Sequence, residues 1–169
     1  MALSALKQNS LHLILLACAL GALAPAIHAD TPAQARQAIQ ATCDRAAASY
    51  ARRDLVGYMA IYSPDFSLRS VEGHKSAFRQ VQSGMKIIFA RNGTNTMSHC
   101  TVSQVVPQGD GARATVQWHY VVHRSRSASA PACTITRGYK AVAVWKKLPG
   151  GWKETSADVI RNDYLEYRG

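Results

Sequence analysis

Three side chains near the end of the chain could carry acid–base chemistry: Asp158, Tyr139 and Arg137. A carboxylate can accept a proton, and a phenol or guanidinium beside it can stabilise negative charge that develops on a substrate. The three residues fall in two expected strands that a turn at Pro149–Gly150 joins into a hairpin. We therefore predict a catalytic group in which Asp158 is the base and the other two residues support it.

The register of this hairpin decides whether these side chains meet. The turn predicts four facing pairs, which are Trp145 with Glu154, Ala143 with Ser156, Ala141 with Asp158, and Tyr139 with Ile160. The small alanines opposite Ser156 and Asp158 would leave room for the floor of a pocket, with Arg137 and Tyr139 at one end. The competing interpretation is that Asp158 and Arg137 form an ordinary structural ion pair.

Aromatic residues are distributed along the chain in positions from which they could line the same pocket. The residues that we expect to line it are Tyr50, Tyr58, Tyr62, Trp118, Tyr120 and Ser156. Tyrosine suits this place because it combines an apolar ring with a hydroxyl that can hydrogen-bond to a ligand or to a developing oxyanion. The simpler alternative is that the tyrosines only fill the core.

Histidines do not form a convincing metal site. His99, His119 and His123 are expected on one polar sheet face, with His99 opposite Val121. His119 and His123 would lie about 13 Å apart along their strand, too far to share one ion. We therefore expect neither a metal nor another cofactor.

The first 29 residues have the features of a secretory signal peptide. Lys7 precedes an apolar run over residues 11–23, and small residues follow it. This order of basic start, apolar centre and small-residue end is typical of export signals. We expect cleavage after Ala29, with Ala26 as the competing site and lipidation of Cys18 as a less favoured route. The sequence thus predicts a periplasmic or secreted bacterial protein.

Removal of residues 1–29 leaves three cysteines: Cys43, Cys100 and Cys133. An odd number in an oxidising compartment predicts one disulfide and one remaining thiol. Cys100 and Cys133 are expected to flank the same strand roughly 10 Å apart, which is too far for a bridge. We therefore expect Cys43 to pair with Cys100 or with Cys133.

Basic residues outnumber acidic residues by 20 to 10 in the 169-residue chain, so that the formal net charge is +10. The hydrophobic content of 47% is enough for a core and excludes a disordered chain. Only one apolar run approaches membrane-spanning length, which excludes a polytopic membrane protein. The basic residues are spread along the chain and form no run, so a solvated basic surface is the simpler interpretation and an anionic envelope surface is the more specific one. Nucleic acid is not expected, since export separates the protein from it.

The apolar pattern predicts three helices followed by a run of strands. Residues recur at three- and four-residue spacing over 31–50, 54–62 and 75–91. Segments rich in Val, Thr, Trp and Tyr predict strands over 66–71, 97–106, 112–123, 133–147 and 152–161. This order indicates a single α+β domain over residues 30–169, with the helices packed on one face of a curved sheet.

A hairpin around Asp110 can be paired in two registers. A three-residue loop, 109–111, is the only one of the two that separates apolar from polar side chains, and we adopt it. It pairs Val102 with Trp118 and Cys100 with Tyr120. The face expected to point inward then holds Cys100, Val102, Val106, Val116, Trp118, Tyr120 and Val122.

The outward face of the last two strands is also expected to be apolar. Its members would be Val142, Val144, Ala157 and Val159. A sheet that is apolar on both sides suggests that one side packs on the helices and the other on a partner chain. The sequence therefore predicts a homodimer through the sheet.

Three short motifs precede the third helix and the last four strands: Arg53-Asp54-Leu55, Tyr62-Ser63-Pro64-Asp65-Phe66 and Glu72-Gly73. With the order of the elements, they resemble the nuclear transport factor 2-like superfamily and, within it, the SnoaL-like group. The resemblance implies a cone-shaped fold in which helices and a curved, antiparallel or mixed sheet enclose a pocket. Members of the superfamily include isomerases, dehydratases, epoxide hydrolases, polyketide cyclases and binding domains, so the fold does not fix the function.

Three functions fit these observations. The first is an exported domain that binds a small apolar or amphipathic molecule in a hydrophobic cone pocket. The second is an isomerase, dehydratase or hydrolase that uses Asp158 as its base. The third is a basic module that interacts with the cell envelope through residues such as Arg124 and Arg126.

Overall fold

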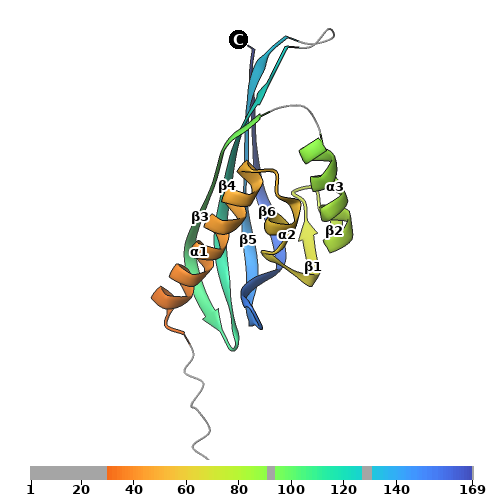
Figure 1. Cartoon of the computed structure of the whole chain (residues 1–169). Coiled ribbons are helices and arrows are strands. Elements are labelled where there is room, and N and C mark those ends of the chain that lie inside the picture. The colour runs from red at the N-terminus through yellow and green to blue at the C-terminus, as the bar shows by residue number, and fades with distance from the viewer. Residues whose placement is uncertain (1–29, 91–93, 127–130, 169) are drawn as a thin grey trace, which may run out of the picture.

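The computed structural model describes residues 30–90, 94–126 and 131–168, and the expected export segment, residues 1–29, lies outside them (Figure 1). The elements in chain order are α1 (Pro32–Ala51), α2 (Leu55–Met59), β1 (Tyr62–Arg69), β2 (Lys75–Ala77), α3 (Phe78–Ala90), β3 (Thr94–Gln108), β4 (Gly111–Arg124), β5 (Cys133–Leu148) and β6 (Gly151–Arg168). Within the described chain, no helix is long and apolar enough to cross a membrane.

The six strands form one sheet in the order β2-β1-β6-β5-β4-β3. Strands β1 and β6 are parallel, and the other neighbours are antiparallel. The three helices lie on one side of this mixed sheet (Figure 1). The predicted α+β architecture, with helices on one face of a curved sheet, is therefore confirmed.

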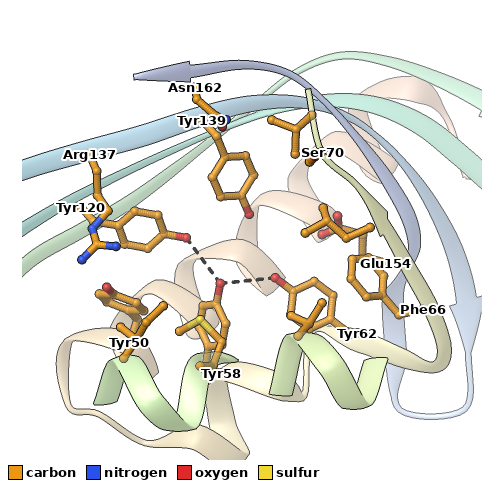
Figure 2. Close-up of a pocket in the computed structure, with 15 residues that line it drawn as sticks. Tyr50, Tyr58, Tyr62, Phe66, Ser70, Tyr120, Arg137, Tyr139, Glu154 and Asn162 are labelled. Carbon is orange, nitrogen blue, oxygen red and sulfur yellow. Dashed lines mark hydrogen bonds between the residues drawn. The ribbon is translucent and has the colours of Figure 1, made fainter. Parts of the chain in front are cut away.

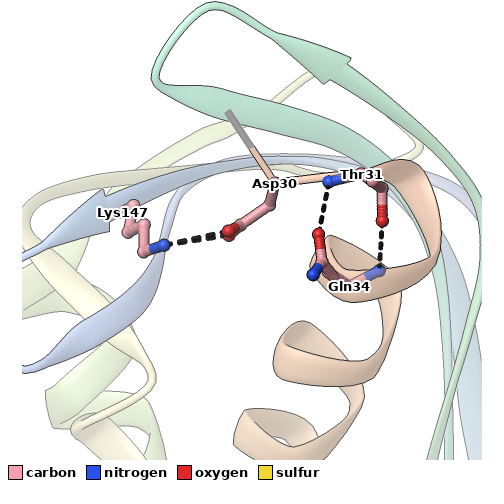
Figure 3. Close-up of polar contacts among 4 residues, drawn as sticks. All are labelled: Asp30, Thr31, Gln34 and Lys147. Carbon is pink, nitrogen blue, oxygen red and sulfur yellow. Dashed lines mark hydrogen bonds and ion pairs between the residues drawn. The ribbon is translucent and has the colours of Figure 1, made fainter. Parts of the chain in front are cut away.

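Helix α1 starts at a complete N-terminal cap (Figure 3). The Thr31 hydroxyl accepts a hydrogen bond from the Gln34 backbone N–H at 3.3 Å, and the Thr31 N–H donates to the Gln34 side chain at 2.9 Å. These bonds pair N–H groups that helix geometry leaves without partners. Immediately before the cap, the Asp30 carboxylate forms an ion pair with Lys147 of β5 at 3.1 Å. The ion pair thus fixes the start of the helix to the sheet. The helix begins where the Thr31–Pro32 pair predicts.

The passage from α1 to α3 differs in its boundaries from the sequence prediction. Helix α2 ends at Met59, and β1 begins at Tyr62, four residues earlier than the strand predicted from residue 66. The strand therefore contains Pro64, which lies near its start, where a missing N–H is tolerated. Residues 75–77, predicted as the first turn of a helix, instead form the short strand β2 against β1.

The hairpin of β3 and β4 corrects the predicted three-residue loop. Gln108 pairs with Gly111, so that only Gly109 and Asp110 form the turn, and Gly109 supplies a positive φ of 59°. A bulge between Ser103 and Val106 then shifts the register by one residue.

Cys100 therefore pairs with Trp118 and Val102 with Val116, rather than with Tyr120 and Trp118 as predicted. The shorter turn and the bulge each shift the pairing by one residue, so together they leave the same side chains on the inward face. Cys100, Val102, Val116, Trp118 and Tyr120 are buried as expected. Val106, before the bulge, is 56% exposed and not inward as predicted.

Two bulges correct the predicted register of β5 and β6. Trp145 pairs with Glu154, as predicted, but the register shifts after that pair and again beyond Ala141. As a result Ser156 lies opposite Val144, Asp158 opposite Val142, and Tyr139 opposite Asn162.

Each bulge adds one residue to β6 and so exchanges its faces. Ala157 is buried in the core beside Ala143, and Val159 packs against the core. The predicted outward apolar face therefore loses Ala157 and Val159 and retains Val142 and Val144.

Candidate functional site

A cavity of about 290 Å³ opens between the helices and the sheet (Figure 2). Its aromatic lining comes from α1, α2, β1, β4 and β5, and consists of Tyr50, Tyr58, Tyr62, Phe66, Tyr120 and Tyr139. Aliphatic side chains complete the wall, including Met85 and Ile88 of α3 and Val159 of β6. The rings pack against one another and form an apolar wall. Polar atoms, mainly the tyrosine hydroxyls, occur at a few points of this wall.

The tyrosine hydroxyls meet near the middle of the cavity. The Tyr58 hydroxyl lies 3.3 Å from the Tyr62 hydroxyl and 3.4 Å from the Tyr120 hydroxyl. Burial raises the pKa of Tyr58 to about 12 and raises the pKa values of Tyr62, Tyr120 and Tyr139 well above the usual range. These groups are therefore neutral hydrogen-bond donors, and the long spacing between them leaves each able to bind a ligand as well.

Glu154 of β6 places a carboxyl group at one end of the cavity (Figure 2). It is 3% exposed, and its Oε2 atom has no hydrogen-bond partner among the described residues. Burial raises the pKa of Glu154 from 4.5 to about 8, because removal from water penalises the charged form. Near neutral pH this carboxyl can therefore hold or release a proton inside an apolar cavity.

Arg137 of β5 lies at the other end of the labelled site in Figure 2, beside Tyr120 and Tyr50. Its Nε atom is buried and has no hydrogen-bond partner among the described groups. A neighbouring hollow of about 310 Å³ shares Arg137, Tyr139 and Asn162 with the cavity. Arg137 thus belongs to the wall that the cavity and this second hollow share.

The structure separates the predicted catalytic group. Tyr139 and Arg137 line the cavity, together with the predicted Tyr50, Tyr58, Tyr62 and Tyr120. Asp158 lies outside it, because the bulge in β6 turns this residue to the outer face. There Asp158 forms an ion pair with Arg69 of β1 at 3.3 Å, with the two side chains 57% and 53% exposed. The predicted pairing of Asp158 with Arg137 is wrong.

Two further residues predicted at the pocket do not line it. Trp118 is 1% exposed and packs in the core, stacked on Tyr120 at a ring separation of 5.7 Å. Ser156 faces away from the cavity for the same reason as Asp158. The sequence analysis missed Glu154, although Trp152 and Glu154 alternate in a way that predicts a shared inward face.

No group of three His, Cys, Asp or Glu side chains that could hold a metal ion occurs within the described ranges. His99 pairs directly with His119, not with Val121 as predicted, and the His99 ring is hydrogen-bonded to the Thr101 hydroxyl at 3.0 Å. The cavity itself offers one carboxyl and several hydroxyls, which favour an organic ligand.

No disulfide joins the three buried cysteines of the described chain. Cys43 of α1 and Cys100 of β3 nevertheless meet in the core, where their thiols are hydrogen-bonded to each other. That contact and burial raise the pKa of the Cys100 thiol. Of the two pairings expected from the sequence, the structure brings together the side chains of the first.

No family model matches the chain, and no curated protein matches it in sequence. Solved structures match its fold. A proposed aromatic ring hydroxylase from Novosphingobium aromaticivorans is 13% identical with a TM-score of 0.60, covering 80% of this chain and 96% of that one.

Two other structures carry the name of a fold family. A Salmonella enterica protein of the nuclear transport factor 2-like superfamily is 18% identical with a TM-score of 0.54, covering 76% of this chain and 92% of that one. A proposed dehydratase of the same family from Streptomyces avermitilis is 15% identical with a TM-score of 0.54, covering 76% and 96% of the two chains. The chain therefore has the nuclear transport factor 2-like fold.

Proposed function

We propose that the protein is an exported domain that binds a small apolar or amphipathic molecule in its cone cavity. The observation that carries this proposal is an aromatic cavity of about 290 Å³ in which a buried carboxyl lacks a hydrogen-bond partner among the described residues. Buried polar groups are almost always paired, and a ligand with one or two polar atoms would pair this one. The proposed export is supported by the order of residues 1–29, which is typical of a secretory signal, and the proposed location is a bacterial periplasm or the outside of the cell.

Native mass spectrometry of the protein purified from an envelope fraction tests this proposal. We expect an added small-molecule mass on the wild-type protein. Val159→Phe should remove it, because Val159 lines the cavity. Ile160→Phe is the matched control, since Ile160 is the next residue in the chain and its side chain is 53% exposed. A bare wild-type protein that also fails to gain thermal stability from any member of a small-molecule library would contradict the proposal.

Catalysis is the second candidate, and the position of Glu154 favours it. A carboxyl with a pKa near 8 can transfer a proton at neutral pH, and the neighbouring tyrosine hydroxyls can stabilise an oxyanion. In this version Glu154 takes the role that the sequence analysis gave to Asp158. Once a bound molecule is identified, Glu154→Gln should abolish its turnover, while Asp158→Asn should leave the turnover intact.

A basic surface that binds an anionic envelope component is the third candidate. Basic residues outnumber acidic ones twofold, and Arg124 and Arg126 are both exposed. Such binding depends on long-range attraction, so it should be lost at high ionic strength. Retention on anionic phospholipid vesicles at about 1 M salt would argue against an electrostatic partner.

A further inference from the structure

Two polar atoms, on side chains at the two ends of the cavity, are buried without a hydrogen-bond partner among the described residues. Glu154 Oε2 and Arg137 Nε are both buried without a hydrogen bond to any described group. Neither residue takes part in an ion pair among the described side chains. Asp163, which lines the neighbouring hollow with Arg137, is paired with Arg161 at 3.1 Å. A carboxyl group and a guanidinium are therefore held apart in one cavity, and each can bind an external partner.

The sheet sets the separation of the two groups. Glu154 pairs with Trp145, and Arg137 lies eight positions away from Trp145 on the same strand, β5. At about 3.3 Å per residue, the backbone of Arg137 lies at most about 26 Å along the strand from the position opposite Glu154. The polar ends of the two side chains are closer to each other than this, because both side chains extend into the cavity. Tyrosine rings occupy the intervening wall, as Figure 2 shows. The cavity is thus elongated, polar at both ends and aromatic between them.

Each part of this cavity selects a different part of a ligand. A guanidinium binds a carboxylate through charge-assisted, often bidentate, hydrogen bonds. A buried carboxyl such as Glu154 can exchange hydrogen bonds with a ligand hydroxyl, and the aromatic wall favours a flat ring. The volume of about 290 Å³ is at the lower end of the range for small-molecule sites, which favours a small ligand.

We propose that the cavity binds an elongated aromatic hydroxy acid, with its carboxylate on Arg137, its ring among the tyrosines and its hydroxyl on Glu154. This assignment rests on the proposed small-molecule-binding function and names the ligand class for the same site. It gives both unpaired groups a partner at once. It also accounts for the position of the carboxyl group and the guanidinium at opposite ends of the cavity rather than in contact.

Isothermal titration calorimetry at pH 7 with three matched compounds tests the assignment. The compounds are 4-hydroxycinnamate, cinnamate, which lacks the hydroxyl, and 4-hydroxycinnamyl alcohol, which lacks the carboxylate. We expect 4-hydroxycinnamate to bind at least tenfold more tightly than either of the others, because each of them leaves one buried group unpaired.

Protein variants then locate each contact. Arg137→Gln should abolish the preference for the acid over the alcohol and keep the preference for the hydroxylated ring. Glu154→Leu should do the reverse. Arg113→Gln and Asp158→Asn are the matched controls, because both residues are exposed and outside the cavity lining. Thermal unfolding of every variant verifies that it is folded, and Glu154→Met, which also lacks a strong hydrogen-bonding group, replaces Glu154→Leu if the latter is not.

The outcomes separate this assignment from the function on which it rests. Equal affinities for the three compounds, or preferences that Arg137→Gln leaves unchanged, would overturn the aromatic hydroxy acid. The same is true if none of the compounds binds while native mass spectrometry finds another molecule that Val159→Phe removes, and in that case the binding function stands. If no molecule is found by either method, both proposals fail.

Discussion

At the scale of single residues, Glu154 is the side chain whose chemistry its surroundings change most clearly. Its carboxyl is buried between aromatic rings, and no cation lies within ion-pair distance among the described residues. Burial without a counter-charge favours the protonated form, which raises the pKa to about 8. The native protein therefore holds a proton here that the unfolded chain releases near pH 4.5.

This difference predicts how stability depends on pH. Between pH 4.5 and about 8 the native state binds the proton and the unfolded state does not, so the free energy of unfolding should fall as pH rises. The full loss is about 5 kcal/mol at 1.36 kcal/mol per pKa unit. Urea unfolding at pH 5 and pH 8 measures most of it, because these values cover the larger part of the interval between the two pKa values. Glu154→Gln should remove most of this loss, whereas Asp158→Asn should keep it; a wild-type protein with equal stability at both pH values would contradict the burial of the carboxyl.

The contact of Cys43 with Cys100 leads to a second prediction. In an oxidising compartment, disulfide exchange with an external disulfide would join the two sulfur atoms and transfer two electrons to that oxidant. Because the bridge would connect α1 to β3 across a long loop, it should stabilise the fold by about 4 kcal/mol. Denatured protein from the envelope should then titrate with one thiol, and Cys133→Ser should reduce that number to zero. Three titratable thiols would contradict the bridge.

At the scale of elements, the bulges determine which residues reach the cavity. Alternation of apolar residues predicts the strands and most of the inward faces, because a half-buried strand has a two-residue period. Thr155 and Ile160 of β6 each add an unpaired residue, and each reverses the alternation. Neither position carries a glycine or another local signal of a bulge. The predicted tyrosines therefore lie at the cavity, while Asp158 and Ser156, which lie between the bulges, turn outward.

Close approach of neighbouring strands predicts the effect of a substitution beside the cavity. A Cβ atom at Gly138 of β5 would collide with the backbone carbonyl of Trp118 on β4, a group that cannot move without breaking the sheet. Gly138→Ala should therefore lower the free energy of unfolding by about 2 kcal/mol. It should also weaken ligand binding, since Arg137 and Tyr139 flank this glycine.

Gly84→Ala provides the control for that measurement. Gly84 lies within α3, and an added Cβ would meet no atom within 4 Å. Alanine has a higher helix propensity than glycine, so the free energy of unfolding of this variant should rise by up to about 1 kcal/mol. Equal chemical denaturation curves for the two variants would show that the β4–β5 approach does not constrain Gly138.

At the scale of the whole molecule, the three described helices cover one face of the sheet, and no helix of the described ranges lies on the other face (Figure 1). The corrected register makes this outer face less apolar than the sequence predicts, because Ala157 and Val159 point inward. Val142 and Val144 of β5 remain there, half-buried and flanked by Asp158 and Ser156 of β6. A second copy of the chain would meet a mixed surface with a small apolar centre, as in many non-obligate interfaces.

We therefore expect a homodimer whose stability depends on that centre. Light scattering after size-exclusion chromatography should give twice the mass of the chain. Val144→Lys should shift the protein to the monomer. In an isologous interface both subunits contribute the same surface, so the substitution introduces two lysines that repel each other. Val56→Lys is the matched control, since its side chain is 82% exposed on α2, on the side of the sheet that the helices cover. A wild-type protein that is monomeric at about 100 μM would exclude the dimer, because non-obligate interfaces of ordinary size dissociate in the μM range or below. A Val144→Lys variant that remains dimeric would show that the contact lies elsewhere.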